Sequence, residues 1–146
     1  MKLLIRPLAL GLVALGSCKK YDNGGSKAKA EKNIKNTWTI GTYYFDGTDA
    51  TSQLLISNYE ETYGDDGVYT RSYTDGNGDA QSETGTWSLV DDKDRLNISG
   101  TGSYELTAQT STVSTSDYDL LKLTKDELWY AFDNGGNNHE FHMVPK

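Results

Sequence analysis

Short runs rich in Tyr, Trp, Thr, Val and Ile alternate with clusters of Gly, Asn and Asp over most of the chain. Aromatic and β-branched residues favour strands, and Gly and Asn supply the positive φ that tight hairpins need. Residues 28–36 alone have helical character, as a short lead-in. The remaining pattern predicts strands at 37–45, 54–63, 67–74, 80–90, 95–99, 103–113, 117–124, 127–133 and 138–144.

Apolar and polar side chains alternate within these runs, as expected for strands with one buried face. Trp87 and Leu89 fall on one face of their run, and Leu121 and Leu123 fall together on another. Sheets built from sequential hairpins avoid bare edges by closing on themselves. The sequence therefore predicts an all-β fold, an antiparallel up-and-down barrel of about eight strands, with a two-sheet sandwich as the alternative.

The first 18 residues have the pattern of an export signal. Lys2 and Arg6 precede an apolar run at 8–15, which as a helix would rise only about 12 Å against a bilayer core of about 30 Å. The run ends in Leu15-Gly16-Ser17-Cys18, which resembles the lipobox of bacterial lipoproteins. The resemblance implies that residues 1–17 are a cleaved signal peptide and that Cys18 is lipidated. The alternative is a secretory signal followed by a free thiol.

A basic, nearly apolar-free stretch follows Cys18. Residues 19–35 carry six lysines against two acidic residues, whereas residues 36–146 carry six basic and nineteen acidic residues. We expect 18–35 to be a flexible tether and 36–146 to be a single domain. The lysines would either contact anionic headgroups or only keep the tether soluble.

Several motifs resemble the small lipocalin-like domains found on many bacterial lipoproteins. Residues 33–40 read NIKNTWTI, like the entry to a lipocalin-like barrel, where a helical turn leads to a tryptophan that plugs the barrel. The likeness continues in DGVY at 66–69, GTWSL at 85–89 and LKLTKDELW at 121–129. It covers essentially all of 33–146 and implies a lipocalin-like barrel of eight strands.

Two positions depart from the better-known lipocalins. Asn36 stands where those proteins carry a glycine before the tryptophan, and the last predicted strand lacks their stacking arginine. Nine strand-like runs are also one more than the family has. We therefore expect one of them, either 95–99 or the Thr- and Ser-rich 107–116, to be a loop.

The sequence contains no familiar catalytic or metal-binding arrangement. His139 and His142 are three residues apart, so on a strand they point to opposite faces and cannot share one ion. The single cysteine is expected to be acylated, and no Gly-x-Ser-x-Gly elbow exists. Composition leaves a glycosidase-like pair of carboxylates open, but most carboxylates fall in turns or tandem pairs such as Glu60-Glu61, where solubility explains them. We therefore expect no enzyme activity, no metal and no cofactor.

Two further observations limit the function. The Asp75-Gly76-Asn77-Gly78-Asp79 run has the opening spacing of a calcium loop, but it lacks the glycine and glutamate that complete one and is also typical of a plain turn. The acidic domain argues against nucleic acid, because that binding depends on cationic contacts to phosphate.

Aromatic residues are plentiful and suit a pocket for an amphipathic ligand, although an eight-stranded barrel is only just wide enough for its own side chains. We expect a membrane-anchored lipocalin-like lipoprotein that binds a small apolar or amphipathic ligand in the cell envelope. The alternative is a solid-cored barrel that serves as an accessory or inhibitory protein-interaction subunit. The residues expected to line the site or plug the barrel are Trp38, Trp87, Leu89, Leu121, Leu123 and Tyr130.

Location follows from the residues after the anchor. Lys19 and Lys20 stand where an aspartate holds some bacterial lipoproteins at the inner membrane. We therefore expect the outer membrane, on either of its faces.

Overall fold

The computed structural model describes residues 25–108, 113 and 116–146. The predicted signal peptide at 1–17 and the predicted lipid anchor Cys18 lie outside the described residues. The elements are α1 (Lys27–Ile34), β1 (Thr37–Phe45), β2 (Thr48–Asp49), the 3-10 turn η1 (Thr51–Gln53), β3 (Ser57–Tyr63), β4 (Val68–Thr74), β5 (Ala80–Val90), β6 (Arg95–Ser99), β7 (Asp117–Leu123), β8 (Leu128–Asn134) and β9 (Asn137–Pro145).

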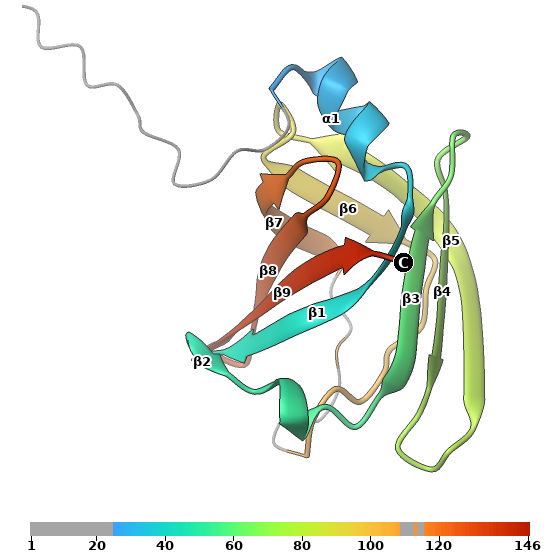
Figure 1. Cartoon of the computed structure of the whole chain (residues 1–146), viewed down its shortest axis with the longest axis vertical. Helices are drawn as coiled ribbons and strands as arrows, with labels where there is room; N and C mark the ends of the chain where they lie inside the picture. The colour runs from blue at the N-terminus through green and yellow to red at the C-terminus, as the bar shows by residue number, and fades with distance from the viewer. Residues whose placement is uncertain (1–24, 109–112, 114–115) are drawn as a thin grey trace, which may run out of the picture.

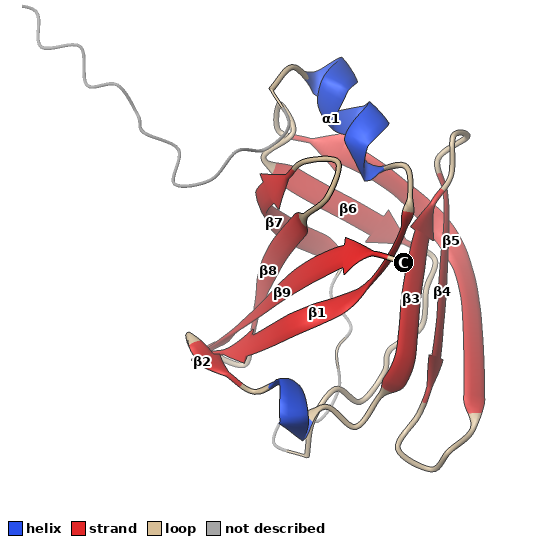
Figure 2. Cartoon of the chain, viewed as in Figure 1, coloured by secondary structure: helices blue, strands red, loops and turns tan. Residues whose placement is uncertain are grey.

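The strands form one antiparallel sheet that closes on itself (Figures 1 and 2). Each of the long strands pairs with its neighbour in sequence, and β1 also pairs with β9 from Trp38↔Pro145 to Phe45↔His139. The two-residue β2 only extends the end of β1. The predicted all-β, antiparallel, up-and-down barrel of eight strands is therefore confirmed.

The predicted strand at 103–113 is wrong for its described residues, 103–108 and 113, whereas the predicted 95–99 is the strand β6. In the described part of 103–113 the chain makes only two isolated bridges, Leu54↔Thr107 and Tyr104↔Val113. Just before it, the N–H and C=O of Gly102 bond to the side chains of Glu83 and Arg71 instead of a neighbouring strand. Side chains thus take the backbone groups that a sheet ladder would need.

Helix α1 closes one end of the barrel, at the top of Figure 1. Ser26 caps it by accepting a hydrogen bond from the N–H of Lys29, and Ala30 and Ile34, four residues apart on one face, are fully buried. Trp38 is also fully buried, and its indole N–H donates to the carbonyl of Ile34 at 2.9 Å. The last residues of the predicted tether, from Lys27 onward, are therefore part of the folded unit.

Strand β7 departs from simple alternation. Its register against β8 shifts between Leu120 and Lys122, as at a β-bulge. Leu120 and Leu123 consequently face the core, whereas Leu121, which the sequence pattern placed on the same face as Leu123, is only half-buried. Among the described residues, no helix combines the length and the apolar character needed to cross a membrane.

Gly85 gives a direct test of the contact between β5 and β6. A Cβ atom at this position would lie 2.1 Å from the carbonyl oxygen of Ser99, a backbone atom that cannot rotate away. We expect Gly85→Ala to lower the free energy of unfolding by about 2 to 3 kcal/mol, because the two strands must separate. Urea unfolding measures the change. Thr84→Ala, an exposed neighbour on the same strand, should stay within about 0.5 kcal/mol of the parent protein, and equal effects would contradict the contact.

Candidate functional site

Among the residues that the structure describes, one carboxylate lies inside the barrel. Glu61 on β3 is 1% exposed, and its neighbours on the same face, Tyr59 and Tyr63, are also buried. Four tyrosine hydroxyls donate to it: those of Tyr59, Tyr69 and Tyr130 reach Oε2 at 3.0, 2.9 and 3.3 Å, and that of Tyr63 reaches Oε1 at 2.9 Å. This tyrosine–Glu61 cluster joins β3, β4 and β8 across the interior.

The cluster suits an ionised carboxylate, which only accepts hydrogen bonds and has about four sites for them. Burial nevertheless raises the pKa of Glu61, and the hydrogen bonds from Tyr63, Tyr69 and Tyr59 only partly oppose this effect. The buried charge is therefore satisfied by hydrogen bonds but still costs stability.

An ion pair between a buried arginine and a half-buried glutamate adjoins this cluster on the side away from α1. Arg71 on β4 is 3% exposed and donates from Nε to Glu83 Oε2 at 2.8 Å, from Nη2 to the same oxygen, and from Nη2 to the carbonyl of Gly102 at 3.0 Å. Its guanidinium carbon lies 4.3 Å from the ring centroid of Tyr104. Because Glu83 Oε1 also accepts the Gly102 N–H, the pair fixes the loop after β6 across the end of the barrel.

A cleft of about 490 Å³ opens at this end, next to the β4–β5 turn at the bottom of Figure 1. We call it the mouth cleft. Its walls combine two tyrosines with several carboxylates and amides: Tyr73, Asp75, Gly76, Asn77, Gln81, Glu83, Ser103, Tyr104 and Glu105. The volume lies within the range of about 300 to 1,000 Å³ that is usual for small-molecule sites.

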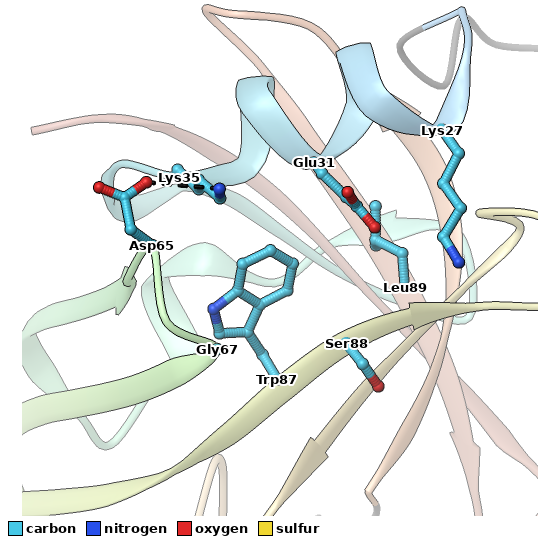
Figure 3. Close-up of a pocket in the computed structure, with 8 residues that line it drawn as sticks. All are labelled: Lys27, Glu31, Lys35, Asp65, Gly67, Trp87, Ser88 and Leu89. Atoms are coloured by element: carbon cyan, nitrogen blue, oxygen red, sulfur yellow. Dashed lines mark ion pairs between the residues drawn. The ribbon is translucent and has the colours of Figure 1, made fainter.

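A second cleft, of about 290 Å³, lies beneath α1 at the other end (Figure 3). We call it the cap cleft. Trp87 and Leu89, two of the predicted lining residues, rise from β5 toward the helix, and Ser88 between them points the other way. Lys35 from the segment after α1 pairs with Asp65 at 3.3 Å across the rim. The indole N–H of Trp87 donates to the Gly64 carbonyl at 3.0 Å, so its polar atom is already satisfied.

The predicted site residues therefore do not converge on one pocket, and none of them lines the mouth cleft. Trp38 is the plug beneath α1, and Trp87 and Leu89 line the cap cleft. Leu123 lies in the general core and Tyr130 in the tyrosine–Glu61 cluster, whereas Leu121 is half-buried on β7.

Glu61 and Arg71 were missed as interior residues, and the solubility explanation of the Glu60-Glu61 pair is wrong for Glu61. A signal for both was present in the sequence. Glu61 sits midway between Tyr59 and Tyr63, and Arg71 is the corresponding residue between two tyrosines on β4. Strict alternation would have placed both on the inward face.

The two histidines lie on opposite faces of β9, as their spacing predicts. His139 is fully buried; its Nδ1 lies 2.8 Å from the Tyr43 hydroxyl, and its Nε2 has no partner among the described residues. His142 lies on the outer face, stacked on Trp129 with ring centroids 3.7 Å apart. Burial lowers the pKa of His139, so the interior imidazole stays neutral.

The Asp75–Asp79 run forms a hairpin turn. Asp75 Oδ1 accepts the N–H groups of Asn77 and Asp79, and Oδ2 accepts from Gln81 Nε2 at 2.9 Å, so both oxygens serve the turn itself. Within the described part of the chain, no group of three or more His, Cys, Asp or Glu side chains is arranged to hold a metal ion.

Comparison with known proteins supports the fold. A lipocalin-like protein from Bacteroides uniformis matches with a TM-score of 0.51 and 12% identity, over 78% of this chain and 99% of that one. An uncharacterized protein from Bacteroides eggerthii matches with a TM-score of 0.46 and 13% identity, over 75% of this chain and 98% of that one. Japanin from Rhipicephalus appendiculatus, bound to cholesterol, matches with a TM-score of 0.47 and 11% identity, over 76% of this chain and 74% of that one. No family model and no curated protein matches the sequence. The chain thus has a lipocalin-like fold, and at these identities the likeness shows the fold alone.

The tyrosine–Glu61 cluster predicts a specific pH dependence. Because the folded-state pKa of Glu61 is raised above its ordinary 4.5, the native state binds more protons than the unfolded state between the two values. The contribution of this group to stability is complete below pH 4.5 and is lost as the pH rises through the folded pKa. We expect Glu61→Gln to remove that loss. In urea unfolding, the free energy of unfolding of the variant should therefore rise relative to that of the parent as the pH rises.

Glu61→Ala is the companion variant. It leaves four buried hydroxyls without their acceptor, and we expect the free energy of unfolding to fall by about 3 kcal/mol or more at every pH. A Glu61→Ala protein as stable as Glu61→Gln would show that the hydroxyls do not depend on the carboxylate.

For His139 we expect stability to change with pH in the opposite direction. Its folded pKa lies below the ordinary 6.5, so the unfolded chain binds a proton that the native state does not. Stability is complete above pH 6.5 and falls as the pH drops through the folded pKa. His139→Phe, which keeps a ring against Phe132, should remove this part of the decline in urea unfolding between pH 7 and 5. An unchanged decline would mean that His139 charges freely in the folded protein.

Proposed function

We propose that this protein is a membrane-anchored binding protein that holds a small amphipathic molecule in the mouth cleft of its barrel. The observation that carries the proposal is the cleft itself: about 490 Å³ in volume, walled by Tyr73 and Tyr104 with polar groups around them. The two tyrosine rings supply apolar surface in a cleft whose other lining side chains are mostly polar, a mixture that suits an amphipathic molecule.

The barrel interior is less suited to binding a ligand than the mouth cleft is. Glu61 and its four tyrosines cross the interior, and displacing them would expose a buried charge. The cap cleft is smaller, and the ion pair of Lys35 with Asp65 crosses its rim. The ligand in this proposal therefore rests on the end of the filled barrel, against the loop that Arg71 and Glu83 hold in place.

Anchoring and location are part of the same proposal. The lipobox-like sequence before Cys18 supports lipidation, and the lysines after it support the outer membrane. Binding, not catalysis, is the function we propose, and the cleft with its two tyrosine rings supports it.

A second candidate, docking of an envelope protein, is favoured by a different observation. On the outer face of the barrel, Lys122, Trp129 and His142 lie on three adjacent strands, and the Lys122 ammonium stands 4.4 Å from the Trp129 ring centroid. Partly exposed aromatic and cationic side chains of this kind occur at protein interfaces. Crosslinking in cells would favour this candidate if it trapped one protein on Trp129 in preference to the mouth cleft.

Filling the mouth cleft tests the main proposal. Ser103 is an exposed lining residue, so Ser103→Trp should occupy the cleft without disturbing the core. In full-length protein carrying Cys18→Ser, which prevents lipidation, we expect the neutral dye Nile red to bind the parent at one site and to bind Ser103→Trp at least about tenfold more weakly. The same small molecule that co-purifies with the parent from its own envelope in native mass spectrometry should be absent from the variant.

Ser82→Trp is the matched control, because Ser82 is exposed on β5 but does not line the cleft. It should bind like the parent. A parent that binds no dye and carries no small molecule, or two tryptophan variants that bind alike, would overturn the assignment of the cleft.

A further inference from the structure

The mouth cleft has a one-sided charge. Asp75, Glu83 and Glu105 line it, and no lysine, arginine or histidine is among its lining residues. The nearest cation, Arg71, is buried and bonded to Glu83 and to the Gly102 carbonyl. A ligand entering the cleft therefore meets carboxylates without a free counter-cation.

The carboxylates differ in what they can offer. Both oxygens of Asp75 serve the turn, and Glu83 is held by Arg71 and Gly102. Glu105 is exposed and has no ion pair or hydrogen bond with any described residue. Its full charge is therefore available to a ligand.

An unpartnered hydroxyl also faces the cleft. Tyr73 is only 8% exposed, yet its hydroxyl, in a cleft-lining side chain, has no hydrogen-bond partner among the described residues. Burial, together with the negative charge of Glu83 and Asp75, raises the pKa of Tyr73, so the hydroxyl remains neutral. The hydroxyl oxygen is open to the cleft, so it is available to a ligand that hydrogen-bonds to it in place of water.

Aromatic rings complete the arrangement. The rings of Tyr73 and Tyr104 lie 5.7 Å apart at 46°, so together they form an angled wall instead of a flat stack. The Arg71 guanidinium carbon already lies 4.3 Å from the Tyr104 ring centroid and 5.9 Å from that of Tyr73, so the rings offer a ligand their remaining carbon surface, which accepts apolar groups. The carboxylates are spread around the cleft and not gathered as metal ligands, which suits a cation of organic size.

We propose that the mouth cleft selects a cationic amphiphile: a molecule with an ammonium group near Glu105 and the Tyr73 hydroxyl, and an apolar part against the two tyrosine rings. This inference rests on the proposed function, because it names the ligand class of the same cleft. It follows from carboxylates, an unpaired hydroxyl and tyrosine faces that meet in one place.

Three ligands with the same decyl chain test the charge. Isothermal titration of full-length Cys18→Ser protein, below each micelle concentration, compares decylammonium, decyl sulfate and decyl maltoside. We expect the ammonium compound to bind at least about tenfold more tightly than the sulfate and to weaken with added salt, because carboxylates attract only the former. Glu105→Gln and Tyr73→Phe should each weaken the ammonium compound about three- to tenfold and leave the maltoside unchanged.

Two controls separate the cleft from the general acidity of the domain. Asp92→Asn changes the net charge by the same amount as Glu105→Gln, but Asp92 is exposed in the turn after β5, near α1 and far from the mouth. It should leave every affinity unchanged. Ser103→Trp should abolish the saturable binding of all three compounds.

The outcomes distinguish the two proposals. If all three compounds bind equally and Ser103→Trp blocks them, the cleft is a binding site but the preference for cations is wrong. If Asp92→Asn weakens the ammonium compound as much as Glu105→Gln does, the attraction comes from the whole domain and the inference fails. If Ser103→Trp changes nothing, the mouth cleft is not the site and the proposed function fails with it.

Discussion

The carboxylate of Glu61 is the constraint around which the interior of this barrel is arranged. An ion taken out of water costs several kcal/mol even after the protein relaxes, whereas a hydrogen bond to a charged group returns about 1.5 to 3 kcal/mol. One or two bonds would leave the carboxylate unfavourable. Four tyrosine hydroxyls supply a full set of donors and offset much of the penalty, although burial still raises the pKa of Glu61. Strands β3, β4 and β8 must therefore keep their relative positions for the charge to remain satisfied.

The same constraint moves any ligand site to the end of the barrel. An eight-stranded barrel has little room to spare, and here bulky rings and their shared acceptor cross it. Arg71, next along the same side of the interior, uses its bonds to Glu83 and Gly102 to hold the loop after β6 over the barrel end. The mouth cleft forms where this loop meets the β4–β5 turn. Its acidic, tyrosine-rich character thus follows from the polar interior beneath it.

Local sequence signals predicted most of the fold, because hairpins depend on turn residues and two-residue alternation. The bounds of β1, β5 and β6 agree with the predicted runs, and the closing pair of β1 with β9 follows from the need to cover sheet edges. Prediction failed in the described part of 103–113, where Tyr104 and Thr107 make only isolated bridges, and where a bulge in β7 reversed the expected facing of Leu121. The tyrosine–Glu61 cluster was hidden for a different reason: a buried acid is identified by partners distant in sequence, and Tyr130 lies 69 residues from Glu61.

The position of α1 gives the proposed anchor a structural consequence. Eight residues separate Cys18 from Lys27, and even when fully extended the nine Cα-to-Cα steps between them span only about 30 Å. Helix α1 covers the end of the barrel opposite the mouth cleft, and its buried face fixes it there (Figure 1). Under the proposed anchoring, the α1 end would stay near the membrane and the mouth cleft would face away from it. A molecule reaching that cleft would arrive through water and not from the bilayer, which favours an amphipathic ion over a purely apolar lipid. The charge of the cleft and its place on the barrel therefore point to the same class of ligand.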